Sequence, residues 1–287
     1  MFHVPVSFVY TAVLTPALRR TVMRELAQCG AKHLVLSSIM IQEMMRDATV
    51  VKDVRRELDQ AGITLLDAHA PYGPECDLYA ANADMLPRQK FAIELAGMFQ
   101  TKTITIHVGN NNRLPDVPFE EHIKNMKRSL TELLPVAERC GVIICIENIW
   151  HKSNTVDVLW ELKNAFPTDH LGFCFDAGHA NLMDEGRNHP QSPAFSAWMG
   201  ETPRWNSHIL EDMLPQIVNC HLHDNDGTGD QHRNIGNGNV KWDHVIPLLK
   251  KAPRLQVIQC EVDMVRDVPV TIRDVVEAFE RLGGIGN

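Results

Sequence analysis

Histidines and aspartates are concentrated in one short segment of this chain, residues 219–232. The segment holds three histidines and three aspartates among glycines, and it follows the apolar pair Ile217-Val218, which is typical of a strand. Imidazole nitrogens and carboxylate oxygens that converge at the end of a strand are the ligands that zinc or manganese requires. The segment therefore predicts a metal site, and the alternative is a polar surface loop that is rich in histidine.

The same pairing of a strand-like run with a terminal histidine or carboxylate recurs along the chain. Short runs of β-branched residues alternate with longer segments of helical period. The predicted strands cover residues 4–10, 33–36, 63–68, 103–106, 142–146, 171–175, 217–220 and 255–260. The predicted helices cover residues 15–29, 39–61, 83–98, 119–140, 156–165, 242–250 and 271–282.

This alternation predicts an α/β fold with a parallel sheet. Successive βα units with short connections require helical crossovers, and about eight such units close a barrel. We therefore expect a single (β/α)8 TIM barrel domain over residues 1–287, with a long excursion after the sixth strand. An open doubly wound sheet is the alternative, and it is disfavoured because no glycine-rich phosphate turn follows the first strand.

The excursion covers residues 182–213 and does not follow the βα pattern. It contains three prolines together with Trp198 and Trp205. Connections this long in compact domains are usually lids or partner surfaces. We interpret the segment as a lid over the barrel mouth, and an interface in a homo-oligomer is the alternative.

Residues able to bind metal stand at or just after most of the predicted strand ends. The catalytic groups of a TIM barrel lie at the C-terminal ends of its strands. The candidate metal ligands are His69, His107, Glu147, Asp176, His179, His221, Asp230, His232 and Glu261. Singly, each can be a cap or a solvated loop residue, but charges that converge on one end of a barrel must be paired or bind metal. Because zinc usually takes about four ligands, the set predicts one to three divalent ions of zinc, manganese or cobalt.

Composition limits the partners and the compartment. The net charge is −8, so a nucleic-acid partner gains no support. The seven cysteines are an odd number without a CxxC pair, which indicates reduced thiols and a cytoplasmic protein. No apolar run approaches the ~20 residues that span a bilayer, so we expect no membrane association.

Five short motifs resemble those of the xylose isomerase-like TIM-barrel superfamily. They are His69-Ala70-Pro71-Tyr72, Asp176-Ala177-Gly178-His179, His221-Leu222-His223-Asp224, Asp230-Gln231-His232 and Ile235-Gly236-Asn237-Gly238. The resemblance extends from about Ile63 to Glu261 and includes the order of the motifs. The superfamily holds sugar isomerases and epimerases as well as endonuclease IV.

The resemblance implies two alternative metal arrangements. Sugar epimerases hold one divalent ion and exchange a proton on the carbon next to the carbonyl through two of its ligands, here Glu147 and Glu261. The residues that match that shell are Glu147, Asp176, His221 and Glu261. Endonuclease IV holds three zinc ions, and the matching residues are His69, His107 and Glu147, then Glu147, Asp176, His221 and Glu261, then His179, Asp230 and His232.

The residues around these ligands favour the isomerase branch. The glycine-rich opening motif typical of endonuclease IV is missing, and residues 73–77 replace the apolar side chains that the DNA enzyme wedges into the duplex. Few basic residues lie near the strand-end loops. They are Arg113, Lys152, Arg187 and Arg233.

We therefore predict a divalent-metal-dependent isomerase or epimerase of a small carbohydrate, acting through a metal-stabilised enediolate. Glu147 and Glu261 are the predicted catalytic residues. Substrate contacts are assigned to Trp150, whose ring can stack on a sugar or simply lie at the rim, and to His179 and Arg233. The alternatives are a zinc phosphodiesterase for abasic DNA, like endonuclease IV, and a sugar-binding barrel with a vestigial site.

Overall fold

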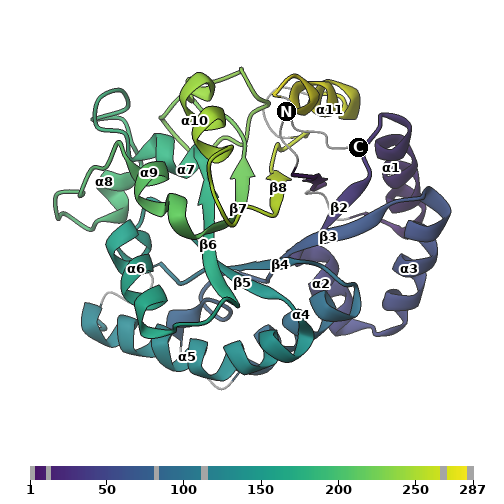
Figure 1. The fold of residues 1–287 in the computed structure, drawn as a ribbon, viewed down its shortest axis with the longest axis horizontal. Helices are drawn as coiled ribbons and strands as arrows, with labels where there is room; N and C mark the ends of the chain where they lie inside the picture. The colour runs from purple at the N-terminus through teal and green to yellow at the C-terminus, as the bar shows by residue number, and fades with distance from the viewer. Residues whose placement is uncertain (1–3, 11–13, 81–83, 111–115, 266–269, 283–287) are drawn as a thin grey trace.

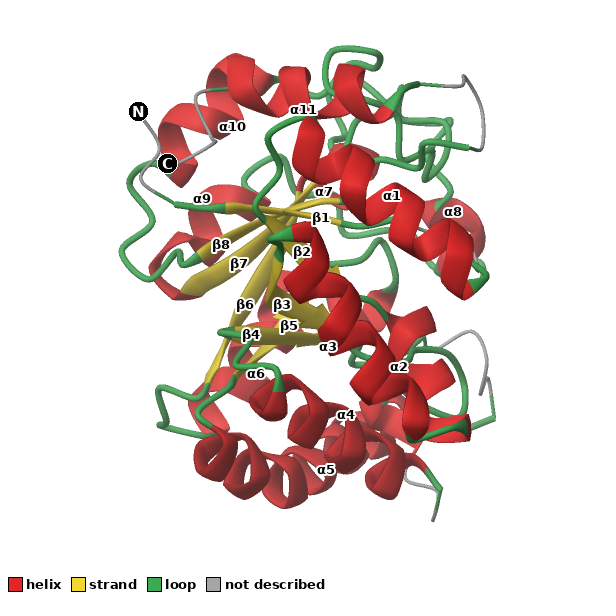
Figure 2. Cartoon of the chain, turned by 90° about the vertical axis from the view of Figure 1, so that its right-hand side faces the viewer, coloured by secondary structure: helices red, strands yellow, loops and turns green. Residues whose placement is uncertain are grey.

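The strand-like runs of the sequence close into a barrel. The computed structural model describes residues 4–10, 14–80, 84–110, 116–265 and 270–282. Its strands pair in parallel in chain order, and β8 closes the sheet on β1. The helices form a ring outside the strands (Figure 1), and the strands slant through the middle of the molecule in the side view (Figure 2). The predicted (β/α)8 barrel is confirmed.

The elements have the following bounds. The strands are β1 Val6–Phe8, β2 His33–Leu36, β3 Thr64–His69, β4 Thr103–Ile106, β5 Ile143–Glu147, β6 Leu171–Asp176, β7 Ile217–Leu222 and β8 Val257–Cys260. The helices are α1 Pro16–Gln28, α2 Ser38–Arg46, α3 Thr49–Ala61, α4 Met85–Met98, α5 Phe119–Cys140, α6 Val156–Ala165, α7 Ala177–Leu182, α8 Ala194–Ala197, α9 Ile209–Met213, α10 Trp242–Leu249 and α11 Ile272–Arg281. The 3-10 helices are η1 Leu78–Ala80, η3 Lys152–Asn154 and η4 Leu214–Gln216.

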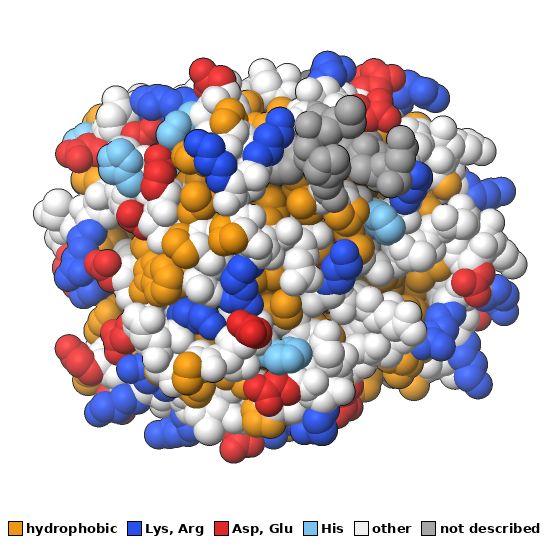
Figure 3. Space-filling view, in the orientation of Figure 1, with side chains coloured by type: hydrophobic (Ala, Val, Ile, Leu, Met, Phe, Trp, Pro, Cys, Tyr) orange, Lys and Arg blue, Asp and Glu red, His pale blue; other side chains and the backbone are white. Residues whose placement is uncertain are grey.

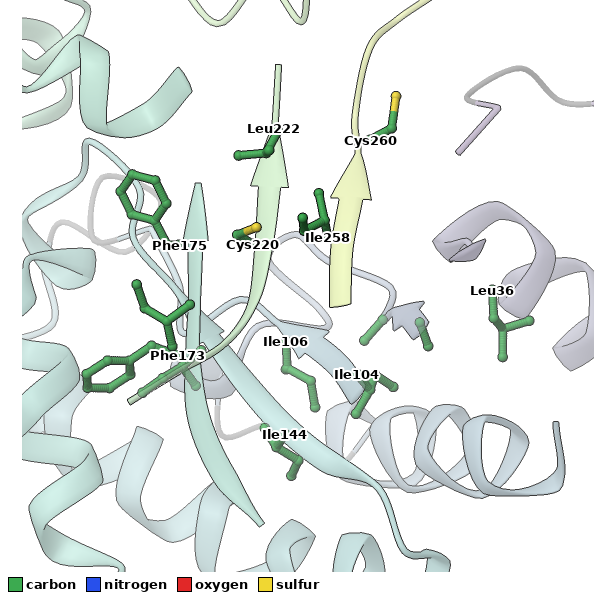
Figure 4. Close-up of a cluster of buried hydrophobic side chains, with 14 of the residues drawn as sticks. Leu36, Ile104, Ile106, Ile144, Phe173, Phe175, Cys220, Leu222, Ile258 and Cys260 are labelled. Atoms are coloured by element: carbon green, nitrogen blue, oxygen red, sulfur yellow. The ribbon is translucent and has the colours of Figure 1, made fainter. Parts of the chain in front are cut away.

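The strands alternate apolar and polar side chains. Ile104 and Ile106 of β4 and Phe175 of β6 belong to the apolar core (Figure 4). Between the two isoleucines, Thr105 contacts Asn219 of β7, a strand that does not pair with β4, so Thr105 points into the barrel. In β4 the period of two thus places the isoleucines under the helices and Thr105 inside the barrel.

One predicted helix, residues 39–61, is two helices in the structure. Helix α2 ends at Arg46, and Asp47 is extended, with φ −143° and ψ 103°. Its Oδ1 atom accepts hydrogen bonds from the Thr49 amide at 2.9 Å and the Thr49 hydroxyl at 2.7 Å. A side chain that bonds the backbone two residues further on competes with the helix, which explains the break.

The predicted helix start at residue 83 lies outside the described residues, and α4 begins at Met85. No helix in the described part of the chain combines the length and the apolar character needed to cross a membrane.

Candidate metal centre

Strands β5 to β8 bring four predicted ligands together. Glu147 and Asp176 are the last residues of β5 and β6, His221 stands near the end of β7, and Glu261 follows β8. One ligand atom from each lies within 4.8 Å of the others. Asp176 also caps the N-terminus of α7, where its Oδ1 accepts the backbone N–H of His179 at 2.6 Å. Neighbouring strand ends of a closed barrel therefore bring these four side chains together as a candidate four-residue shell, and their binding of a metal stays a prediction.

Opposite charges hold the shell together. His221 Nδ1 lies 3.2 Å from Glu261 Oε1 and 3.3 Å from Glu147 Oε1. Burial acts to raise the pKa of Glu147, but His221 and the hydrogen bonds from His107 and His179 lower this pKa well below its usual range. Burial likewise opposes ionisation of Glu261, and His221 again lowers the pKa. Both carboxyl groups are therefore ionised at neutral pH.

Two more predicted ligands reach Glu147 from the side of β3 and β4. His107 Nε2 lies 3.1 Å from Glu147 Oε2, and His69 Nε2 lies 3.9 Å from the same oxygen. His69 Nδ1 lies 2.9 Å from the carbonyl oxygen of Ala70, so the ring hydrogen sits on Nδ1 and is donated to this oxygen. The Nε2 atom, without a hydrogen, then faces the carboxylate of Glu147. The structure thus places both histidines beside Glu147.

A second cluster surrounds Asp230 in the loop after β7. The Nε2 atoms of His179 and His232 lie 3.6 Å and 3.1 Å from Asp230 Oδ2, and His223 Nε2 lies 3.8 Å from Oδ1. The opposite nitrogens of His179 and His232 lie 2.9 Å and 2.7 Å from the carbonyl oxygens of Asn148 and Glu261. Backbone acceptors for Nδ1–H leave Nε2 as the ligand atom, so three imidazoles and one carboxylate converge as in a tetrahedral zinc site.

His223 was absent from the predicted ligand set. It is fully buried, and its ring occupies the space above Gly178, where an added Cβ would lie 2.1 Å from His223 Cε1. The missed signal is its spacing from His221, because residues two apart at a strand end point to the same side. His221, near the end of β7, and His223, just after the strand, therefore both lie at the barrel mouth.

The donor sets fit divalent ions. Three carboxylates with one imidazole suit manganese, zinc or cobalt, and three imidazoles with one carboxylate suit zinc. Asp230 Oδ1 is buried without a hydrogen-bond partner among the described residues, as expected for an oxygen that binds a metal ion. Buried carboxylates at this density need cations, and the described residues that line the adjoining cavity include no lysine or arginine.

The cavity above the shell has a volume of about 490 Å³. Glu147 and Glu261 line it together with aromatic and polar side chains. Trp150 packs its ring edge-on to His179, with centroids 5.0 Å apart, and Tyr72, which was not among the predicted substrate contacts, stacks on His107 at 4.9 Å. The structure therefore puts Trp150 and His179 at the cavity, and their contact with substrate stays a prediction.

The basic residues near the mouth are paired with carboxylates. These pairs are Lys152 with Glu201 at 2.7 Å, Arg187 with Asp184 at 2.7 Å, and Arg233 with Asp226 at 3.1 Å. Arg113 lies outside the described residues. Arg233 does not line the cavity above the shell, so its predicted substrate contact gains no support. Over the face shown in Figure 3, Lys and Arg side chains are interspersed with Asp and Glu.

The excursion after β6 is anchored to the loop after β5. Trp198 is only 2% exposed, and its indole N–H donates to the carbonyl oxygen of Trp150 at 3.0 Å. Trp205 packs edge-on against His189 and Phe195. Neither tryptophan lines the cavity, so the prediction that they cover the mouth gains no support. Trp198 instead holds the backbone of Trp150 in place through this hydrogen bond.

Comparison with known proteins agrees with this architecture. Residues 24–282 match the family model described as a xylose isomerase-like TIM barrel. The chain belongs to the xylose isomerase-like TIM barrel family. The resemblance seen in the motifs is therefore confirmed. An uncharacterised protein of Methanocaldococcus jannaschii is 26% identical to this barrel over 209 residues, which cover 69% of this chain and 64% of that protein. The match thus spans less than two thirds of that relative.

Solved structures share the fold of this xylose isomerase-like barrel at low sequence identity. A D-tagatose 3-epimerase-like protein is 22% identical, with a TM-score of 0.68 over 90% of this chain and 89% of that chain. A D-allulose 3-epimerase from Methylomonas sp. is 12% identical, with a TM-score of 0.71 over 98% of both chains. The IOLI protein, solved with a binding zinc atom, is 17% identical, with a TM-score of 0.67 over 92% of this chain and 91% of that chain.

Proposed function

We propose that this xylose isomerase-like barrel is a divalent-metal-dependent isomerase or epimerase of a small carbohydrate. The observation that carries the proposal is the four-residue shell, whose ligand atoms lie within 4.8 Å of one another while Glu147 and Glu261 also line the cavity. A carboxylate that borders both an ion and a substrate cavity is placed to move a proton on the substrate.

Glu147 and Glu261 are the acid–base pair in this proposal. Because the pKa of each is lowered, both carboxyls are ionised near neutral pH, the form that accepts a proton from carbon. An ion in the shell would polarise the substrate carbonyl and stabilise the charge of the enediolate. Return of the proton to the same carbon from the opposite face gives an epimer, and return to the neighbouring carbon gives an isomer.

The cavity and the similar structures support a carbohydrate as the substrate. A volume of about 490 Å³ lies within the roughly 300–1,000 Å³ of small-molecule sites. Trp150 and Tyr72 offer aromatic surfaces, and Asn110 and His151 offer polar groups. Two of the similar structures are of sugar epimerases or their relatives, and a third contains zinc. The seven free thiols support a cytoplasmic location.

A phosphodiesterase acting on abasic DNA is the second candidate. The cluster of three histidines around Asp230 favours it, because that cluster offers a site for a further ion. Recognition of a phosphate backbone requires lysine and arginine side chains close to the site. The described residues that line the cavity include neither lysine nor arginine. The nearby Lys152, Arg187 and Arg233 are each paired with a carboxylate. The isomerase is therefore the better fit.

Exchange of substrate hydrogen with solvent tests the proposal. Metal-loaded protein is incubated in deuterated water with a panel of ketoses, aldoses and sugar acids, and Mn²⁺ or Co²⁺ is added. We expect deuterium at one carbon of at least one sugar, and its loss in Glu261→Gln. Absence of label across a broad panel, together with nicking of an abasic duplex that EDTA abolishes, would replace the isomerase with the phosphodiesterase.

A further inference from the structure

Polar side chains cross the barrel interior beside the four-residue shell. Asp67 on β3, Thr105 on β4 and Asn219 and His221 on β7 are all 0% exposed. Strands β4 and β7 do not pair with each other, so contacts between them span the interior of the barrel. Buried polar groups in such a place need partners, and hydrogen bonds link these four side chains one after another, starting from His221.

The two ring nitrogens of His221 face different surroundings. Nδ1 lies 3.2 Å from Glu261 Oε1 and 3.3 Å from Glu147 Oε1, whereas Nε2 lies 3.3 Å from Thr105 Oγ1. A nitrogen that binds an ion carries no hydrogen, so the hydrogen of ion-bound His221 sits on Nε2 and points to Thr105. The Thr105 oxygen is therefore an acceptor that favours this tautomer, and Cys174 is a further hydrogen-bond partner of the ring.

Asn219 and Asp67 hold this acceptor in place. Asn219 Nδ2 lies 3.5 Å from Thr105 Oγ1 and 3.3 Å from Asp67 Oδ2. Because Asp67 accepts one hydrogen of the amide nitrogen, it determines which end of the Asn219 amide faces Thr105. The nitrogen end donates to the threonine oxygen, which thus receives N–H groups from Asn219 and from His221. The threonine oxygen then serves His221 as an acceptor.

We infer that Thr105 is a positioning residue for the metal centre, held by Asn219 and Asp67 and acting through His221. Thr105 does not line the cavity, so it does not touch substrate. The inference rests on the proposed function in one respect, namely that an ion occupies the four-residue shell. Replacing a residue that orients a metal ligand typically lowers metal affinity about 10–100-fold.

Mn²⁺ titration followed by electron paramagnetic resonance tests this inference without any substrate. Mn²⁺ prefers carboxylate oxygen, which directs it to the shell with three carboxylates rather than to the three imidazoles. The variants are Thr105→Val, which removes the acceptor at nearly constant volume, and Thr105→Ser, which keeps it. Thr103→Val is the matched control, because Thr103 is equally buried on β4 and its hydroxyl makes no hydrogen bond.

We expect Thr105→Val to weaken Mn²⁺ binding about 10–100-fold, and Thr105→Ser and Thr103→Val to stay within about threefold of the parent protein. If Thr105→Val does not fold, Asn219→Leu interrupts the same chain one step away and is expected to weaken binding in the same direction. Equal affinity in parent and variants overturns the role of Thr105 alone. A parent protein that binds no divalent ion overturns the proposed function, and the inference with it.

Discussion

The imidazole rings of His223 and His232 lie face to face, with centroids 3.9 Å apart and 12° between their planes. Their Nε2 atoms lie 3.8 Å and 3.1 Å from the two oxygens of Asp230. Two imidazolium rings this close would repel each other, whereas one ion bound at both Nε2 atoms removes both hydrogens. The stacked pair therefore belongs to a candidate ion site, separate from the four-residue shell.

Replacing His223 with alanine is expected to reduce the zinc bound per chain by about one ion, because a tetrahedral site loses one of its four ligands. Elemental analysis after dialysis measures the stoichiometry. Gly178→Ala is the matched variant, since its new methyl group would displace the His223 ring without removing it. Unchanged zinc content in both variants would show that the stacked pair holds no ion.

Glu147→Gln and Glu261→Gln are each expected to slow deuterium incorporation by about 10²–10⁴-fold, the usual contribution of a positioned acid–base group. The rate is followed by proton NMR in deuterated water. Glu75→Gln serves as the control, because Glu75 is an exposed residue paired with Arg88. A rate within threefold of the parent in either catalytic-site variant contradicts the assignment.

Metal binding near Asp230 is expected to strengthen as pH rises. Burial acts to lower the pKa of His232, but the hydrogen bond and charge of Asp230 raise it from 6.5 to about 9. In the metal-free protein this protonated pair stabilises the fold below pH 6.5, and the contribution is lost as pH rises through about 9. An ion must displace that proton, so zinc affinity should increase from pH 6.5 to about 9 and then level off.

Calorimetry in buffers of different ionisation enthalpy measures this effect directly. We expect a proton to be released for each zinc ion bound at pH 7.5, and the release to shrink above pH 9. His232→Asn removes one titrating group and should weaken the dependence without abolishing it, because Asp176 and Asp230 also raise the pKa of His179 against the effect of burial. A zinc affinity that is constant across this pH range in the parent protein would contradict the ion pair between His232 and Asp230.

Trp198→Ala is expected to lower the free energy of unfolding by about 3–5 kcal/mol, because it empties a buried aromatic site. It also removes the hydrogen bond to the carbonyl of Trp150. Urea denaturation compares it with Phe195→Ala, a change at a residue that is 39% exposed and should cost about 1 kcal/mol or less. Equal stability of the two variants would mean that the excursion is not anchored through Trp198.

The sequence predicted the barrel and the grouping of the candidate metal ligands because both depend on local patterns. Runs of β-branched residues mark the strands, and Glu147, Asp176 and His221 stand at their ends. Once a barrel is closed, neighbouring strand ends must meet. That geometry needs no knowledge of side-chain pairing, and it explains why residues distant in sequence could be grouped in space.

Features that depend on the tertiary contacts of a single side chain were not predictable in this way. Arg233 forms an ion pair with Asp226, and this pairing depends on the conformation of one loop. The break between α2 and α3 depends on the side chain of Asp47 bonding Thr49 rather than solvent. Burial of Trp198 depends on the path of a long connection, for which periodicity carries no information.

Asp176 connects the metal centre to a helix. One of its oxygens accepts the His179 amide hydrogen at 2.6 Å, and the other lies 3.9 Å from His221 Nδ1 and 3.2 Å from His223 Nε2. An ion that immobilises Asp176 also immobilises the first turn of α7, so the His179 amide should exchange with deuterium more slowly when the centre is loaded. That single backbone hydrogen can serve as an intrinsic occupancy sensor, read by mass spectrometry before any substrate is known.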